Sequence, residues 1–192
     1  MDEGYIKYKA RWTKEQITVA PEIVREINLC RSKLFAKKWI GMYPDGIGYG
    51  NISLKLNDKS FLISGSATGA IARTTINDYA IVDDYDIKNN HISCRGMVAA
   101  SSESLSHAAL YTKETTHIVH IHSEKLWLDN RNKFPTTDES IAYGTPEMAA
   151  ELLRCKESIE SDFGVIVMGG HWEGIIAYGN SYEQIFELLL AL

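Results

Sequence analysis

Two histidines, His120 and His122, lie two residues apart within the apolar run at 116–127 and could bind one metal ion. On a β-strand, side chains i and i+2 point to the same face. Both imidazoles would therefore project together, while Val119 and Ile121 face the core. Two imidazoles on one strand face can reach a single zinc ion at about 2.0–2.1 Å. A chain with six histidines also produces such a pair by chance, so two structural histidines stay an alternative.

A third histidine, His171, could complete the site from a loop between two expected strands. It follows two glycines in the sequence GGHWEG, and glycine permits close backbone approach and unusual dihedral angles. Three histidines leave an open coordination position, which is typical of a catalytic rather than a structural zinc site. Zinc with an open position acts as a Lewis acid on a carbonyl or enolate oxygen. Taken alone, a single loop histidine would usually be a surface residue.

Glu103, in the sequence SSES, is a candidate general base near such a metal. Alternatively, it is a carboxylate in the first turn of a helix, where the helix dipole favours negative charge. Ser101 and Ser102 precede it, and the free N–H groups at a helix start would suit a bound phosphate. The turns GYGNIS at 48–53 and SGSATG at 64–69 expose further amides that could form anion nests. Such sequences are also often ordinary turns.

These residues must be positioned by a fold that alternates strands with helices. The pattern of apolar residues predicts strands at 5–12, 61–64, 79–82, 90–94, 117–122, 165–168 and 174–178, and a glycine-rich turn that runs into a strand at 46–56. Helices are expected at 21–41, at 103–111 after a cap at Ser101 or Ser102, at 145–159, and from Ser181 onward with a capping box to Gln184. This order indicates an α/β protein with a mostly antiparallel sheet and helices on both faces.

Composition limits the classes of partner. The chain has 192 residues, 45% hydrophobic and 23% charged, which suits one globular domain. A net charge of -5 gives no basic field, so nucleic acid and anionic membranes are not expected partners. No apolar run approaches the roughly 20 residues that span a bilayer, and the polar N-terminus lacks a signal-peptide pattern. Three separated cysteines indicate free thiols, and we expect a cytoplasmic protein.

Several of these motifs, in this order, resemble the class II aldolase/adducin family, the group of the L-fuculose-phosphate aldolases and L-ribulose-5-phosphate 4-epimerases. They are GNIS at 50–53, ISGSATG at 63–69, SSE at 101–103, IVHIHS at 118–123, AYGTPEMA at 142–149, and GGH with GIIAYG at 169–179. The resemblance extends from about residue 21 to the C-terminus. It implies one domain over residues 1–192 with a three-layer αβα sandwich around a mostly antiparallel sheet, usually assembled as a homotetramer.

The resemblance also implies a zinc-dependent aldolase, with another divalent transition metal as an alternative. Zinc would be held by His120, His122 and His171, and Glu103 would move a proton at the carbon next to the ketone. In the aldolases, zinc stabilises the enediolate left when a carbon–carbon bond of a phosphorylated keto sugar breaks. The residues implied to cradle the substrate phosphate are Asn51, Ser64, Gly65, Ser101 and Ser102.

Other activities of the family stay open as alternatives. An epimerase, a dehydratase or a decarboxylase of a sugar phosphate would use the same scaffold. A non-catalytic, adducin-like binding module is a further alternative, but such members have generally lost the zinc ligands. The epimerases typically carry a different acid at position 103, so Glu103 favours carbon–carbon lyase chemistry over an epimerase, and the three retained histidines disfavour the binding module.

The sequence departs from the family pattern at the third-histidine loop, in the segment before it and at its end. The loop reads HWEG at 171–174 where the family usually has His-Gly. We expect Glu173 to be exposed or to line the rim, with a contact to a zinc-bound histidine as the alternative. The segment 122–143 is short for an aldolase, where it normally carries a tyrosine that acts as a proton donor. Tyr143 is its one tyrosine, and we do not assign that role to it. The sequence ends at Leu192, directly after the last expected helix, which predicts an open site.

Overall fold

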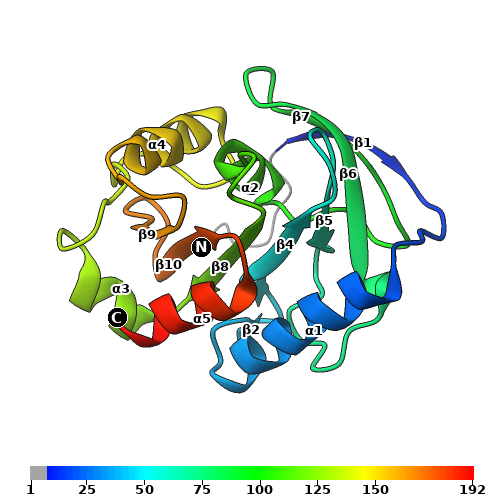
Figure 1. The fold of residues 1–192 in the computed structure, drawn as a ribbon, viewed down its shortest axis with the longest axis horizontal. Helices are drawn as coiled ribbons and strands as arrows, with labels where there is room; N and C mark the ends of the chain where they lie inside the picture. The colour runs from blue at the N-terminus through cyan, green and yellow to red at the C-terminus, as the bar shows by residue number, and fades with distance from the viewer. Residues whose placement is uncertain (1–7) are drawn as a thin grey trace.

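A central sheet lies between two layers of helices in the computed structural model, which describes residues 8–192 (Figure 1). The sheet has eight strands in the order β1-β7-β6-β5-β4-β8-β10-β9. Neighbouring strands are antiparallel except β1 and β7, which are parallel. The strands are β1 Lys9–Thr13, β4 Asn51–Lys55, β5 Phe61–Ser64, β6 Tyr79–Asp86, β7 His91–Arg95, β8 His117–His122, β9 Gly164–Val167 and β10 Gly174–Gly179. The predicted three-layer, mostly antiparallel α/β architecture is therefore confirmed.

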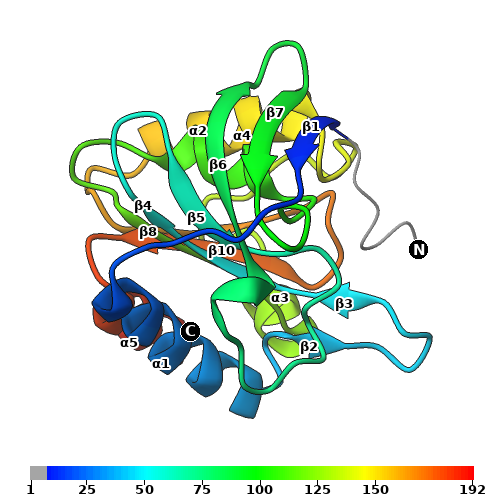
Figure 2. The same ribbon diagram turned by 90° about the vertical axis from the view of Figure 1, so that its right-hand side faces the viewer.

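Two pairs of helices cover the two faces of this sheet (Figures 1 and 2). One face carries α1 (Pro21–Ala36) and α5 (Tyr182–Leu190), and the other carries α2 (Ser104–Leu110) and α4 (Pro146–Glu157). Strand β8 shows how alternation serves both layers. Its Val119 and Ile121 belong to the core under α1 and α5, whereas Ile118 packs with residues of α4. Because alternate side chains point to opposite faces, His120 and His122 lie on the side of α2 and α4.

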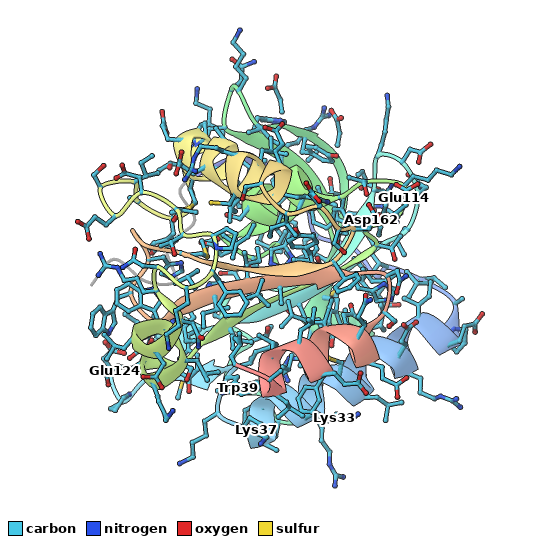
Figure 3. The ribbon with its side chains drawn as sticks, turned by 60° about the vertical axis from the view of Figure 1, so that its left-hand side comes forward. Lys33, Lys37, Trp39, Glu114, Glu124 and Asp162 are labelled. Carbon is cyan, nitrogen blue, oxygen red and sulfur yellow. The ribbon has the colours of Figure 1, made fainter. Side chains whose placement is uncertain are left out.

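Aromatic and basic side chains join the ends of α1 and α5. Trp39, just after α1, packs against Phe186 of α5 with ring centroids 6.1 Å apart. The Lys33 ammonium lies 5.3 Å from the Phe186 ring, and the Lys37 ammonium lies 5.8 Å from the Trp39 ring (Figure 3). Exposed cation–π contacts of this kind are worth about 0.5–1 kcal/mol each. The apolar C-terminal segment is thus a packed helix of the α1–α5 layer.

Several details differ from the prediction. The unpredicted elements are the hairpin β2 (Gly41–Met42) and β3 (Gly48–Tyr49), the 3₁₀ helix η1 (Ile76–Asp78), and α3 (Glu124–Asn130). All are too short to show a clear period. The start of the second helix differs from the prediction, because α2 begins at Ser104 and its N-cap residue is Glu103, which makes no side-chain cap bond. The Ser101 hydroxyl instead accepts from the Glu103 N–H in the preceding turn. Positions 5–7 of the expected first strand lie outside the described residues.

No helix within residues 8–192 combines the length and the apolar character that crossing a bilayer requires.

Candidate metal centre

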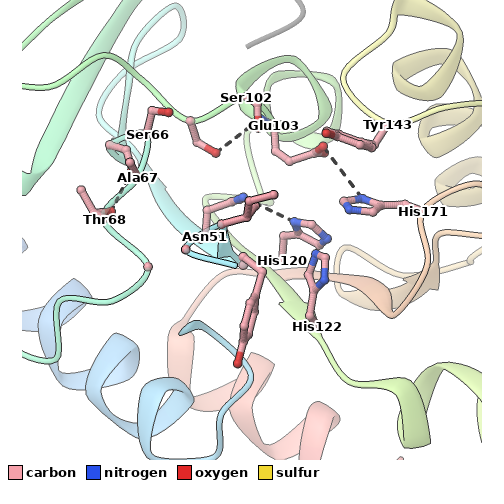
Figure 4. Close-up of a pocket in the computed structure, with 18 residues that line it drawn as sticks. Asn51, Ser66, Ala67, Thr68, Ser102, Glu103, His120, His122, Tyr143 and His171 are labelled. Carbon is pink, nitrogen blue, oxygen red and sulfur yellow. Dashed lines mark hydrogen bonds and ion pairs between the residues drawn. The ribbon is translucent and has the colours of Figure 1, made fainter. Parts of the chain in front are cut away.

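Three buried imidazoles point toward one another at one end of the sheet (Figure 4). His120 and His122 come from β8, and His171 comes from the loop between β9 and β10. Their ring centroids are 4.8 to 4.9 Å apart, and one ligand atom from each lies within 4.8 Å of the others. The three residues are 1%, 3% and 4% exposed. Three buried imidazoles at this spacing could hold a divalent metal ion and leave one coordination position open.

Electrostatics favour the neutral imidazole, which is the form that binds a metal. Burial, followed by the neighbouring His122 and His171, holds the pKa of His120 well below its usual value. Burial and His171 likewise hold the pKa of His122 well below its usual value. Nε2 of His120 is buried and has no hydrogen-bond partner in the described part of the chain. The chemistry of these donors therefore fits a divalent transition metal.

Glycines on both sides of His171 allow this close packing. A Cβ on Gly170 would lie 1.8 Å from the carbonyl oxygen of Ile141, and a Cβ on Gly174 would lie 3.1 Å from His120 Nε2. Tyr143 stacks on the His171 ring, with centroids 4.4 Å apart and ring planes 21° from parallel. The loop therefore fixes the third imidazole through close backbone contacts and an aromatic stack.

Glu103 lies beside the histidines in the turn that leads into α2. It is 2% exposed, and its Oε1 lies 3.9 Å from Nδ1 of His171. The neighbouring Ser101 hydroxyl accepts a hydrogen bond from the Glu103 N–H at 3.3 Å. This places a carboxylate where it could exchange a proton with a molecule bound next to the imidazoles.

The pocket in front of the histidines has a volume of about 220 Å³. The predicted site residues that line it, besides the histidines and Glu103, are Asn51, Gly65, Ser101 and Ser102. The hydroxyl of Ser64 has a different position. It accepts from the Ile52 N–H at 3.1 Å and donates to the Ile52 carbonyl at 3.2 Å, inside the sheet. Ser66 and Thr68 of the same turn line the pocket instead (Figure 4).

A buried arginine supports the turn at 65–69 from behind. Arg31 of α1 is 1% exposed and donates to the carbonyls of Thr68 at 2.8 Å and Ile71 at 2.5 Å. The C=O and N–H of a trans peptide point in opposite directions, so this contact turns the Gly69 N–H away from Arg31. Among residues 8–192, no lysine or arginine lines the pocket. Arg31 thus places a positive charge behind the turn at 65–69, while no lysine or arginine of the described residues lines the pocket itself.

Replacing Arg31 with methionine is expected to destabilise the fold. Methionine fills similar space but donates no hydrogen bond, so two buried carbonyls lose a charged donor. Charge-assisted hydrogen bonds contribute about 1.5–3 kcal/mol each, so the two would contribute about 3–6 kcal/mol. Methionine also avoids the cost of burying a charged guanidinium, and we therefore expect the free energy of unfolding to fall by roughly 2–3 kcal/mol. Urea denaturation measures this change. Arg25→Met on the exposed side of the same helix is the control, expected to change stability by less than about 0.5 kcal/mol. Equal effects of the two substitutions would contradict the assignment.

Two further histidines lie outside the cluster. His107 Nδ1 is 2.6 Å from the Ser53 hydroxyl, and burial lowers the pKa of His107 to about 3. His107 therefore has the features of a structural histidine: it is buried and its ring contacts Ser53. His117 lies on the opposite face of β8, where its Nε2 is 2.9 Å from Glu26 Oε1. His117 therefore faces away from the three clustered histidines.

Sequence reasoning missed two tyrosines of the hairpin β2–β3. The Tyr43 hydroxyl is 2.9 Å from His122 Nδ1 and donates to Glu173 Oε2 at 2.6 Å. Tyr49 lines the pocket, with its ring centroid 5.4 Å from that of His122. The sequence PDG at 44–46 between the two tyrosines is a turn signal that could have indicated this hairpin. The Glu173 side chain is 20% exposed, its carboxylate lies 3.9 Å from His122 Nδ1, and it accepts from Tyr43. This supports the alternative, a contact with a candidate ligand histidine, over an exposed Glu173.

Comparison with known proteins identifies the family. Residues 34–192 match the Class II Aldolase and Adducin N-terminal domain, so the chain belongs to this family. The solved L-fuculose 1-phosphate aldolase is similar, with 18% identity over 90% of this chain and 84% of that chain and a TM-score of 0.66. YgbL from Klebsiella pneumoniae is also similar, with 16% identity over 91% and 86% of the two chains and a TM-score of 0.65. No curated protein sequence gives a significant match. At these identities, the solved structures support the fold.

Proposed function

We propose that this chain is a zinc-dependent lyase that cleaves a phosphorylated keto sugar by a retro-aldol reaction. The observation that carries the proposal is the convergence of three buried imidazoles beside Glu103, in a pocket whose other wall is a turn rich in glycine and serine. Zinc is the proposed ion because three histidines with an open position are typical of catalytic zinc. Imidazole ligands also accept manganese, iron or cobalt.

The proposed roles of the residues follow from their positions. Zinc held by His120, His122 and His171 would supply Lewis-acid stabilisation of negative charge on substrate oxygens. In the cleavage direction, the hydroxyl that becomes the aldehyde oxygen would lose its proton to water as the carbon–carbon bond breaks, and Glu103 would then deliver a proton to the carbon next to the ketone. In the condensation direction, the same carboxylate would remove that proton. Burial of Glu103 at 2% exposure limits exchange of this proton with bulk water.

The substrate phosphate is proposed to bind on the wall opposite the histidines. Backbone N–H groups of the turn at 65–69 and the hydroxyls of Ser101 and Ser102 would contact the phosphate oxygens, with Asn51 beside them. The pocket volume of about 220 Å³ suits a small metabolite rather than a polymer. Ser64 would contribute indirectly, because its hydroxyl joins β5 to β4 next to the turn.

The proposed assembly is a homotetramer. Exposed apolar side chains in α3, after α3 and in the His171 loop support an interface between subunits, since exposed apolar surface on a protein often marks a contact surface. They are Leu128, Phe134 and Trp172, which are 54%, 38% and 46% exposed. Light scattering of the purified protein at several concentrations tests this assembly.

Product analysis is the test of the proposed reaction. Ketose 1-phosphates would be incubated with zinc-loaded protein, and release of dihydroxyacetone phosphate would be followed with an NADH-coupled enzyme. We expect one dihydroxyacetone phosphate and one aldehyde for each sugar consumed. The cleavage itself is redox-neutral, so NADH is consumed only by the coupling enzyme. A stereoisomer of the substrate would instead indicate an epimerase, water loss a dehydratase, and carbon dioxide a decarboxylase. Zinc-loaded, folded protein that converts no sugar phosphate would favour the adducin-like binding module.

A further inference from the structure

Glu173, Tyr43 and His122 form a hydrogen-bonded chain that ends at the histidine cluster. The Tyr43 hydroxyl donates to Glu173 Oε2 at 2.6 Å and lies 2.9 Å from Nδ1 of His122. The Glu173 carboxylate itself is 3.9 Å from that nitrogen, so the tyrosine oxygen bridges the two groups. The side chain of His122 is 2% exposed and that of Glu173 is 20% exposed. The chain therefore connects a buried imidazole to a carboxylate that water reaches.

The direction of these hydrogen bonds determines which nitrogen of His122 carries a proton. A phenol has one proton, and Tyr43 gives it to the Glu173 carboxylate, which is an acceptor. The Tyr43 oxygen can then only accept from His122, so Nδ1 of the imidazole must carry the N–H. This leaves the lone pair of Nε2 as the ligand atom for a metal. A hydrogen bond to the other ring nitrogen is the usual way in which a protein orients a metal-binding histidine.

The backbone at Glu173 adds a second observation. Its φ is +64°, in the left-handed region that side chains other than glycine rarely adopt and that costs of order 1–3 kcal/mol. A glycine would adopt this conformation without strain. Glu173 therefore has a backbone conformation with a local cost, at the position from which its carboxylate accepts from Tyr43.

We propose that Glu173 and Tyr43 are positioning residues that fix the tautomer and orientation of His122 and so strengthen metal binding. The same contact joins the hairpin β2–β3 to the metal centre, because the Tyr43 ring packs on the pocket-lining Tyr49 with centroids 4.5 Å apart. This proposal rests on the proposed function only in that the three histidines bind a metal. It does not depend on which reaction the site performs.

Metal affinity of two conservative variants tests the proposal. Zinc affinity would be measured by competition with a chromophoric chelator for Tyr43→Phe and for Glu173→Gln. Loss of a partner that orients a ligating histidine typically weakens metal binding by about 10–100-fold, and we expect this range for both variants. Visible absorption of the cobalt-loaded proteins should also shift, since the donor strength of His122 changes. Glu124→Gln, which neutralises an exposed acid at the start of α3, is the control and should change zinc affinity by less than about twofold.

A double variant shows whether Glu173 and Tyr43 act as one hydrogen-bonded chain or independently. Glu173 acts through the Tyr43 hydroxyl, so Tyr43→Phe with Glu173→Gln should bind zinc about as tightly as Tyr43→Phe alone. Additive losses, or affinities of the single variants equal to that of Glu124→Gln, would overturn the proposal. Thermal unfolding of the metal-free proteins shows whether a variant is folded. Tyr43→Phe, which keeps the ring contacts, decides the question if Glu173→Gln is unstable.

Failure of this proposal and failure of the proposed reaction give different results. An unaltered protein that binds no zinc would overturn both. Zinc binding without turnover of sugar phosphates would overturn only the lyase, and the affinities of the Tyr43 and Glu173 variants would then still decide the role of the chain.

Discussion

Replacing His120 and His122 together by alanine is expected to remove the bound metal and abolish turnover. The double variant keeps one imidazole, His171, of the three whose ligand atoms lie within 4.8 Å of one another. Lewis-acid stabilisation by a metal is worth several kcal/mol, so its loss should reduce kcat/KM by on the order of 10³-fold or more. Elemental analysis of protein purified without chelator or histidine tag should give about one zinc per chain before the change and none after it.

The same strand offers a matched control for this experiment. His117 lies on the opposite face of β8, against Glu26, so His117→Ala alters the same element without touching the cluster. We expect unchanged metal content for this variant. Treatment of the unaltered protein with EDTA should abolish turnover, and added zinc should restore it. Full activity in the presence of EDTA, or metal retained by the double variant, would contradict the metal-dependent function.

The pair on β8 could be predicted because it depends on a local rule. Side chains two residues apart share a strand face whatever the rest of the chain does. Val119 and Ile121 indicated that the opposite face of the strand packs into a core, as it does under α1 and α5. His171 was harder, since its approach depends on the backbone of a distant segment, where a Cβ on Gly170 would meet Ile141. The two glycines before His171 indicated that another backbone segment approaches this loop closely, but they did not indicate which segment it is.

The parts of the site that could not be predicted depend on contacts between distant segments. Tyr43 and Glu173 are 130 residues apart in the sequence, and Arg31 contacts the turn at 65–69 from a helix 37 residues earlier. No periodic pattern indicates such contacts, because they arise only when the sheet brings the segments together. The hairpin that carries Tyr43 has strands of two residues each, too short for alternation to be visible.

The departure of the HWEG loop from the family pattern has a structural counterpart. Sequence reasoning favoured an exposed or rim-lining Glu173 and kept a contact with a zinc-bound histidine as the alternative. The structure supplies a partner for Glu173 from β2–β3, at a backbone position with φ of +64°. The role of Glu173 therefore depends on the hairpin β2–β3, which the sequence did not predict.

Replacing Glu103 with glutamine is expected to abolish most turnover while leaving the metal in place. The amide keeps the size of the carboxylate but cannot take up or deliver the proton. General acid–base catalysis contributes about 10²–10⁴-fold, so kcat should fall by that factor. Metal content should stay unchanged, because the candidate ligand set consists of the three histidines. Steady-state kinetics and elemental analysis on the same preparation measure both quantities.

The combination of lost turnover and retained metal distinguishes a proton-transfer role from a structural one. If Glu103 served mainly to orient His171, from which it is 3.9 Å away, the glutamine variant would lose metal affinity together with activity. Glu147→Gln neutralises an exposed first-turn carboxylate of α4 and should change neither. Full activity of Glu103→Gln would reject the assigned role. Loss of zinc together with turnover would move Glu103 from the proton-transfer step to the support of the metal centre.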